Sequence, residues 1–421
     1  PASLFPGSTA FGAVNPEAER LFGGLPPAET IPWAAWLRPL ASWGILLLFV
    51  WLIMGALSII VLPQWRDNEK LPFPLVEVQA SLIEPPADGA LLPAIFRTRT
   101  FWLAFAAIFS LYSLNMLAQY FPERAPGIPL LFDLSGVFTE PPMGYFPLLK
   151  TTLFFIFVAA GFFMSFRMGF SAWFIPLCYG LYVAAGRTYV PTFSPNSVTD
   201  HRIGAMLVIC GYVLWLGRRH WLEVGKSMLF RLRGDERTRD AVAGWLLVVS
   251  LAGLISWMYW FGVGGWSFFY ALNLLLMTIL IMRFIAETGM PFMRMDPGYR
   301  TMLMDLAPVS WLTPVAVYFS GVFNLFSQIS TRTSFSTMSL HALALDKEPG
   351  EKRKIGFLGL FLGVALLGVV VSGAAHLGEA GVRGEILSVR LGRLLQIAHD
   401  RAVLFFHRRA HGGNGVEIFF G

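Results

Sequence analysis

The stretch Ala41–Leu62, ASWGILLLFVWLIMGALSIIVL, contains no charged side chain. A helix needs about 20 mainly apolar residues to cross the hydrocarbon core of a bilayer. This segment meets that requirement by itself and therefore predicts a membrane-spanning helix.

The composition of the whole chain agrees with that prediction. Of its 421 residues, 55% are hydrophobic and 14% are charged, and the mean hydropathy is +0.60. A soluble domain carries about 25% charged residues, so the composition indicates an integral membrane protein. The net charge of +6 is then best explained by cytoplasmic loops, with no nucleic-acid partner. Cys178 and Cys210 both lie in apolar runs, so neither a disulfide framework nor a cysteine metal site is expected.

Further apolar runs on the C-terminal side of the first one predict additional spans. The expected fold class is all-α, a polytopic transmembrane helical bundle with about eight or nine spans and with re-entrant elements as an open alternative. The predicted further spans are 101–120, 151–166, 168–185, 203–217, 241–261, 266–282 and 355–375.

The apolar run 151–185 is too long for one upright span. As a single helix it would measure about 52 Å, against about 30 Å for the hydrocarbon core. Arg167 and Gly169 lie near its middle. We expect two short helices joined by a tight turn at Arg167; the alternative is one tilted helix with Arg167 snorkelling to the surface.

The distribution of Lys and Arg predicts the orientation. The loop 218–239 is the most basic and should be cytoplasmic. Counting spans outward from it places 64–100, the turn at Arg167 and 283–354 on the same side. A single helix over 151–185 would put two basic loops on opposite sides, so this count favours the two-helix interpretation.

Three regions are expected along the chain. Residues 1–40 form a Pro/Gly-rich periplasmic or interfacial segment, and 41–375 form the transmembrane domain. The basic tail 376–421 has no spanning run; it is either an amphipathic surface helix or a sequence foreign to the rest.

No enzyme motif is present. The sequence lacks GxSxG, HExxH, a P-loop and the Rossmann glycine pattern. We therefore expect no catalytic residues, no metal ligands and no cofactor, and neither an enzyme nor an ATP-driven pump. In so charge-poor a chain, ionisable residues beside helix breaks are the best candidates for a functional site.

The first such segment is RDNEKLPFPLVEVQASLI, residues 66–83. Pro72 and Pro74 stand between a charged patch that includes Glu69 and an apolar run that carries Glu77. Proline is favoured at the start of a helix. The segment is either a half-helix whose N-terminus faces a substrate anion or a cytoplasmic loop leading into an interfacial helix.

The second segment is RFIAETGMPF, residues 283–292. Arg283 and Glu287 are four residues apart and share a helix face. Arginine before glutamate is the weaker order for a local pair, which suggests that each has another partner. Gly289 and Pro291 should end the helix. The alternatives are a buried polar pair lining a pathway and an ordinary basic anchor with a surface pair.

The third segment, residues 308–345, is apolar but rich in Ser, Thr, Asn and Gln, and it includes Asn324. Pro308 and Pro314 interrupt it. It is a weak spanning candidate and a good re-entrant candidate. The alternatives are an interfacial amphipathic region and polar residues that hold helices together.

Two of these segments resemble known proteins. RDNEKLPFPLVEV resembles a segment of oligopeptide transporter (OPT) proteins. RFIAETGMPF resembles the Arg-x-x-Ala-Glu-x-Gly-x-Pro segment of an uncharacterised set of prokaryotic multi-pass proteins distantly similar to those transporters. LWLGRRHW at 214–221 and SFRMGFSAWF at 165–174 resemble further stretches of that set, in the same order, over about residues 30–375.

The resemblance implies proton-coupled import of peptides or metal chelates. It also implies that earlier helices of the family are missing from this chain, and the tail from 377 onward does not fit its pattern.

These observations predict a secondary active transporter of small solutes in the inner (plasma) membrane, with the lipid bilayer and a small-molecule substrate as partners. Glu77 and Glu287 are the proton-coupling candidates, and Arg283 is the candidate for an anion or a partner charge. The alternative is a non-transporting membrane scaffold or assembly subunit. The substrate, the coupling ion and whether the chain forms a homo-oligomer stay open.

Overall fold

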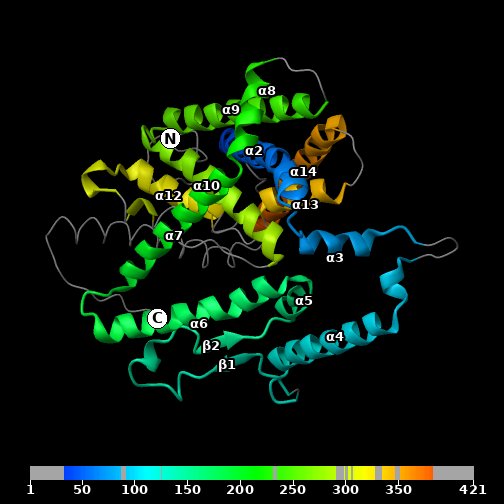
Figure 1. Ribbon diagram of the computed structural model, residues 1–421, viewed down its shortest axis with the longest axis vertical. Coiled ribbons are helices and arrows are strands. Elements are labelled where there is room, and N and C mark those ends of the chain that lie inside the picture. The colour runs from blue at the N-terminus through cyan, green and yellow to red at the C-terminus, as the bar shows by residue number, and fades with distance from the viewer. Residues whose placement is uncertain are drawn as a thin grey trace. The chain divides into compact units, whose positions relative to one another are not determined.

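The computed structural model describes residues 33–86, 92–124, 126–230, 235–290, 298, 302–304, 307–327, 334–346 and 351–382. The described chain is almost entirely helical, which confirms the all-α fold class. Its β-structure is one two-stranded antiparallel hairpin (Figure 1).

The chain divides into two compact units. One consists of residues 49–358, and the other combines residues 1–48 with 359–421. The helices α2 (Trp33–Pro63) and α14 (Glu351–Val382) each run from one unit into the other. The contacts given below lie within the unit 49–358.

Between α2 and α14 the elements follow one another in chain order. They are the π-helix η2 (Gln64–Asn68), α3 (Pro74–Ile83), η3 (Ala94–Arg97), α4 (Arg99–Tyr120), β1 (Leu131–Asp133), η4 (Met143–Tyr145), β2 (Lys150–Thr152), α5 (Phe155–Phe163), α6 (Phe166–Tyr189), α7 (Pro195–Leu216), α8 (Arg218–Leu229), α9 (Asp235–Trp260), α10 (Trp266–Thr288), η5 (Val309–Trp311), α12 (Pro314–Ser327) and α13 (Phe335–Leu345).

Six helices of the described chain are long and apolar enough to cross a membrane. They cover Trp36–Asn68, Arg99–Tyr120, Phe166–Tyr189, Thr238–Trp260, Trp266–Thr288 and Gly356–Ala375. The helices α3, α12 and α13 are apolar but shorter. The described part of the third segment, 308–345, contains the short helices α12 and α13, and whether it is re-entrant stays a prediction.

Two predicted spans are not among these six. The run 151–185 does break into two helices, but the break falls at Met164 and Ser165, and Arg167 is already inside α6. Residues 150–152 form β2, which leaves α5 only nine residues, or about 14 Å. The predicted span 203–217 belongs to α7, which is long enough but less apolar because it begins with polar residues such as Asp200 and Arg202.

The predicted sidedness of the basic loops does not depend on these two segments. Removing two spans that lie between 64–100 and 218–239 leaves the parity of the count unchanged. Both loops still fall on one side, together with the segment after α10. Arg167, which precedes the α6 span in this count, and the segment 186–202, which follows that span, both change sides.

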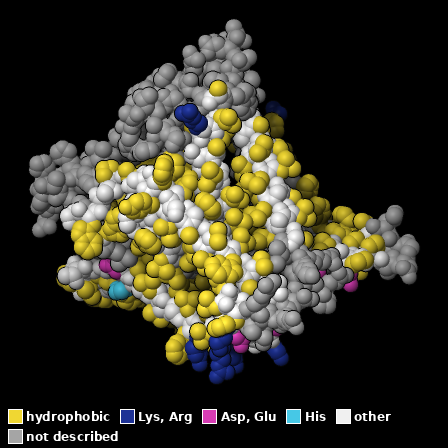
Figure 2. Space-filling model, turned by 90° about the horizontal axis from the view of Figure 1, so that it is seen from above, with side chains coloured by type: hydrophobic (Ala, Val, Ile, Leu, Met, Phe, Trp, Pro, Cys, Tyr) yellow, Lys and Arg dark blue, Asp and Glu magenta, His cyan; other side chains and the backbone are white. Residues whose placement is uncertain are grey.

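Helix α10 is central in the unit 49–358. It packs against α3, α7, α9, α12 and α13, and 61% of its most apolar window is buried, against none of the corresponding window of α4. Hydrophobic side chains also spread over much of the described surface in Figure 2, and Lys and Arg side chains gather at its lower edge. Such a surface suits contact with lipid.

The hairpin β1–β2 lies in the segment that joins α4 to α5. Asp133 at the end of β1 accepts hydrogen bonds from the hydroxyl and the backbone N–H of Ser135, and Lys150 pairs with it at 3.2 Å. The Ser135 hydrogen bonds, helped by Lys150, lower the pKa of the exposed Asp133 carboxyl.

Candidate functional site

The candidate site begins where α2 changes its winding. Pro63 has no N–H to donate to the preceding turn, and the next five residues form the π-helix η2. Its characteristic bond runs from the Glu69 N–H to the Gln64 carbonyl, at 2.9 Å. Lys70 follows at φ 54° and ends the helix. Short π-helical turns are rare and are frequently found at functional sites.

A second break, at the C-terminus of α10, lies against the first. Phe73, at φ 43°, donates its backbone N–H to the Ala286 carbonyl of α10 at 3.0 Å. Helix α3 then begins at Pro74, as predicted. Gly289 ends α10 in the left-handed conformation, at φ 65°, and a Cβ there would lie 2.8 Å from the Pro74 Cβ. The N-terminus of α3 and the C-terminus of α10 are therefore in direct contact.

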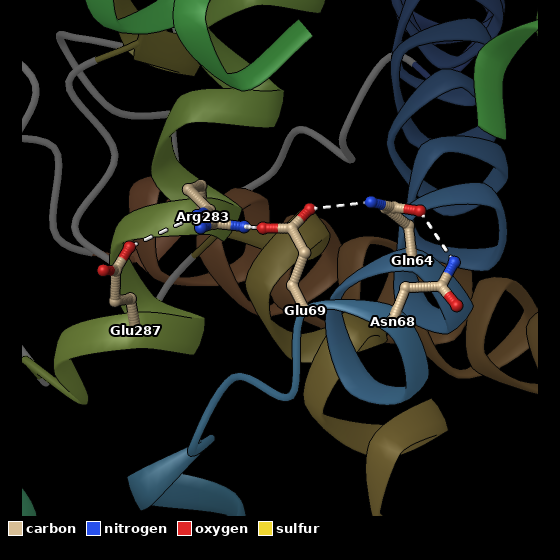
Figure 3. A network of polar contacts seen from close by, with 5 residues as sticks. All are labelled: Gln64, Asn68, Glu69, Arg283 and Glu287. Carbon is tan, nitrogen blue, oxygen red and sulfur yellow. Dashed lines mark hydrogen bonds and ion pairs between the residues drawn. The ribbon is translucent and has the colours of Figure 1, made fainter. Parts of the chain in front are cut away.

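Arg283 links the two breaks (Figure 3). Its Nη1 donates to Glu69 Oε2, which lies 214 positions away in the sequence, and its Nε donates to Glu287 Oε2 at 3.2 Å. On the other side, Gln64 Nε2 donates to Glu69 Oε1 at 3.0 Å, and Asn68 Nδ2 donates to Gln64 Oε1 at 2.9 Å. We call these five residues the Arg283 network.

Burial within the Arg283 network is uneven. The side chains of Arg283 and Glu69 are 11% and 12% exposed, whereas Glu287 is 34% exposed. The Arg283 guanidinium also lies 5.7 Å from the centre of the buried Trp65 ring, within the range of a cation–π contact. One cation thus faces two carboxylates, and the three groups carry a net charge of −1 when all are ionised.

Helix α8 supports the same end of α2. His220 is buried, and its Nε2 lies 2.7 Å from the Ile60 carbonyl oxygen, in the last turn before η2. Because a carbonyl oxygen only accepts hydrogen bonds, Nε2 must carry the proton. The contact fixes α8 to the helix whose winding changes four residues later.

A buried serine cluster joins α13 to α2 and α10. Ser58 Oγ lies 2.7 Å from Ser339 Oγ, 3.2 Å from the Ser336 carbonyl oxygen and 3.4 Å from Met282 Sδ. All four residues are buried. Met282 directly precedes Arg283, so α13 is anchored beside the residue that organises the network.

The structure brings together five of the predicted site residues and places others apart. Glu69, Arg283 and Glu287 form the ion pairs, and Pro74 contacts Gly289. Four other predicted positions are not part of the network: Pro72 is exposed before α3, Glu77 is exposed on α3, Arg167 is exposed on α6, and Asn324 is partly buried on α12. Pro291 lies outside the described residues.

Sequence reasoning missed the neutral members of the site. Gln64 and Asn68 flank Trp65 in η2, but a π-helix has no hydrophobic period that would single them out. His220 stood inside the quoted stretch LWLGRRHW, and its basic neighbours made it resemble part of a surface loop. Ser58 lies among apolar residues of the first predicted span. A serine in such a position is a sequence signal for a hydrogen bond between helices.

Among the described residues there is no group of three His, Cys, Asp or Glu side chains that could hold a metal ion. The Arg283 network thus places two carboxylates of different exposure on one guanidinium, at a point where η2 and α10 end.

Comparison with protein families identifies the chain. Residues 4–380 match a family of unknown function (DUF6785), and the chain belongs to that family. Comparison with curated proteins and with solved structures finds no match. The expectation of an uncharacterised family is therefore confirmed, and the match is somewhat longer than the stretch 30–375 on which the resemblance rested. The distant similarity to oligopeptide transporters stays a prediction.

Proposed function

We propose that this member of a family of unknown function is a proton-coupled secondary active transporter of small solutes in the inner (plasma) membrane. One observation carries the proposal: Arg283 is shared between Glu69 and Glu287 where η2 and α10 end and α3 begins. Interrupted helices with ionisable groups are a recurrent feature of transporter sites, because the freed backbone and the charges there serve substrate and ion.

The uneven burial supports different roles for the two carboxylates. Glu287 is the more exposed and is held by a 3.2 Å hydrogen bond, so it is the proposed proton acceptor. A proton on Glu287 removes one negative charge and weakens its bond to Arg283 Nε. Arg283 then keeps Glu69 as its sole carboxylate partner in the network, and the three groups become neutral overall.

The backbone contacts provide a route from this charge change to a movement. Glu287 lies next to Ala286, whose carbonyl accepts from Phe73 N–H, and two residues before Gly289, which touches Pro74. A change in the last turn of α10 therefore acts directly on the start of α3. The resemblance to oligopeptide transporters supports peptides or metal chelates as the solutes to be tried first.

The test is uptake into proteoliposomes under an inward proton gradient, with mixtures of di- and tripeptides and of metal chelates. The expected result is accumulation that collapses with a protonophore. Glu287→Gln should abolish gradient-driven accumulation but retain exchange of substrate across the membrane, because the neutral side chain imitates the protonated state. The matched control is Glu84→Gln, which alters an exposed carboxylate at the C-terminal end of α3, outside the network and outside the coupling candidates. Normal accumulation by Glu287→Gln would exclude its role in coupling.

Solvent access separates a transporter from a membrane scaffold. In a background with Cys178→Ser and Cys210→Ala, single cysteines next to Glu287 should react with a water-soluble thiol reagent, and substrate should change the rate. Substrate-independent reactivity together with no uptake would favour the scaffold.

A further inference from the structure

We propose that helix α8 binds the headgroups of anionic phospholipids and thereby supports the end of α2 that carries part of the Arg283 network. The inference goes beyond the proposed function, because it concerns a second partner and a surface that the network does not use. Its tests measure binding and stability, so they do not require that a solute be transported.

One face of α8 packs inside the unit 49–358, along α9. His220, Val224 and Ser227 are buried and recur at intervals of four and three residues, which is the spacing of a single helix face. Met228 continues this face, and its carbonyl accepts from Trp245 Nε1 of α9 at 3.3 Å. The orientation of α8 is therefore fixed by its packing.

The opposite face of α8 carries two lines of exposed side chains. Leu222 and Leu229 are 64% and 77% exposed and are seven residues apart, which is about two turns. Arg219 and Lys226 are also exposed and seven residues apart, so they form a second line beside the leucines. At a membrane surface such leucines enter the boundary of the acyl chains while the cations reach the phosphates, which is how amphipathic interfacial helices bind. Basic residues that only orient a chain in the membrane need no leucines beside them.

The neighbours of α8 mark the ends of two candidate membrane spans. His220 contacts the Ile60 carbonyl, and the apolar run of α2 ends at Leu62, just before the polar η2. The candidate span of α9 begins at Thr238, shortly after α8 ends at Leu229. Both ends lie on the side that the distribution of Lys and Arg predicts to be cytoplasmic. The surface of the cytoplasmic leaflet carries a negative potential that comes from anionic lipids.

The charges of α8 are complementary to an anionic headgroup. The helix carries the basic Arg218, Arg219 and Lys226 against one acidic residue, Glu223. Arg219 and Lys226 form no ion pair with another described residue, so both are available to an external anion. Arg218 lies 4.6 Å from the centre of the Trp215 ring, and Trp215 is 67% exposed. Tryptophan is enriched at the level of the lipid headgroups, where the basic side chains would meet phosphate.

One side chain connects α8 with the Arg283 network. His220 Nε2 donates to the Ile60 carbonyl at 2.7 Å, and Gln64, a member of the network, lies about one turn further along the chain. Gln64 donates to Glu69, which pairs with Arg283. A headgroup that holds α8 at the membrane surface would therefore also restrain the end of α2 through His220.

The first test compares the full chain in nanodiscs of phosphatidylcholine and in nanodiscs that also contain the anionic phosphatidylglycerol. Phosphatidylglycerol should raise the melting temperature and stay bound in native mass spectrometry. Salt at about 1 M, where the Debye length is about 3 Å, should remove most of the rise. Equal melting temperatures in the two lipids would overturn the proposal. An equal rise caused by inorganic phosphate in phosphatidylcholine nanodiscs would also overturn it, because it would show a site for a free anion.

Charge variants locate the lipid. Arg219→Gln combined with Lys226→Gln should weaken phosphatidylglycerol binding about 25-fold, because each cation at an anionic surface contributes about fivefold. The exchange Arg219→Lys with Lys226→Arg preserves the charge and should keep the affinity within about threefold. The matched control, Arg124→Gln with Lys150→Gln, removes two exposed cations from the segment between α4 and α5 and should have a much smaller effect. Equal losses in the two neutralised variants would mean that the lipid responds to total charge alone, and would contradict a site on α8.

The leucine line has its own test. Leu222→Gln replaces an exposed side chain, so the protein should fold, and phosphatidylglycerol binding should weaken about fivefold. Unchanged binding in this variant would contradict an interfacial helix. If the neutralised variant of α8 does not fold, Leu222→Gln and the charge-preserving exchange still decide.

Hydrogen exchange tests the connection to α2. Phosphatidylglycerol should slow amide exchange over residues 60–70, and the slowing should disappear when Arg219 and Lys226 are both replaced by glutamine. Exchange in α4 should not change. Binding to α8 without slower exchange over 60–70 would reject the support of α2, and equal slowing in α4 would show a general effect of the anionic bilayer.

Discussion

Helices α10 and α4 are similar in length and hydropathy but differ completely in surroundings. They contain 23 and 22 residues, with mean window hydropathies of 2.0 and 1.7. Yet 61% of the α10 window is buried inside the unit and none of the α4 window. On α4 the aromatic side chains mainly contact one another, as in the stack of Phe101, Phe105 and Phe109.

The difference shows where polar side chains become informative in a membrane protein. Helix α10 carries the buried Asn273 and Thr278 and the nearly buried Arg283, whereas the polar residues of α4 are exposed or only partly buried in the unit. Apolar content alone indicates that a helix can cross a membrane. Buried polar side chains indicate, in addition, that the helix faces other helices. Equivalent substitutions should therefore lower the free energy of unfolding much more on or near α10 than at exposed positions of the unit.

The largest expected effect is that of Arg283→Gln. It would leave Glu69 buried without its cation, and removing one member of a buried ion pair typically costs about 3–5 kcal/mol. The matched control is Arg66→Gln, since Arg66 pairs at 2.9 Å with Asp67 in an exposed position of η2. That substitution should cost less than about 1 kcal/mol. Unfolding of the purified protein by heat or by a denaturing detergent measures both.

A double variant sharpens the same experiment. Adding Glu69→Gln to Arg283→Gln removes the uncompensated charge, so the pair should be more stable than Arg283→Gln alone. If the stability losses of the two single variants simply add in the double variant, the side chains of Arg283 and Glu69 do not depend on each other. The contrast between the buried α10 and the exposed α4 would then not extend to this ion pair.

A smaller effect is expected at Gly289. An alanine there must adopt φ 65° and place its Cβ 2.8 Å from Pro74, so Gly289→Ala should cost about 2–3 kcal/mol. Gly264 provides the control, because it has the same φ but nothing within 4 Å of the position that a Cβ would take. Gly264→Ala should cost only the backbone part, about 1–2 kcal/mol. Equal melting temperatures for the two variants would mean that the contact between α10 and α3 adds nothing.

Much of the fold was predictable because lipid makes simple demands. The length of the apolar runs located the spanning helices. Pro74 begins α3, at the first-turn position that proline favours, and Gly289 ends α10. The span at 151–166 was not predictable in this way. Its first two residues, Thr151 and Thr152, belong to the strand β2, and the apolar residues after them form only the nine-residue α5, although a hydropathy scale gives no sign of where that helix begins.

The site was predictable only in part. The unfavourable order of Arg283 and Glu287 correctly suggested a further partner for the arginine, which is Glu69. Sequence could not choose between Glu69 and Glu77 as the residue that reaches α10, since both lie beside the same prolines. The choice depends on the π-helical turn and on Lys70 at φ 54°, and backbone conformations of that kind leave no periodic signal.

The smallest expected effect comes from one substitution made on both helices, the loss of a tyrosine hydroxyl. Tyr270 of α10 is fully buried and donates to the Ala316 carbonyl of α12 at 2.6 Å, so Tyr270→Phe removes this hydrogen bond between the two helices and should cost about 1 kcal/mol. Tyr112 of α4 is 45% exposed and touches Phe155 through its ring, which Tyr112→Phe preserves. Its unfolding free energy should stay within about 0.5 kcal/mol of the unmodified chain. The same chemical change then measures the two environments directly. A loss at Tyr112 as large as that at Tyr270 would show that α4 has a protein partner at this face, and that its exposed side is an interface and not a lipid-facing surface.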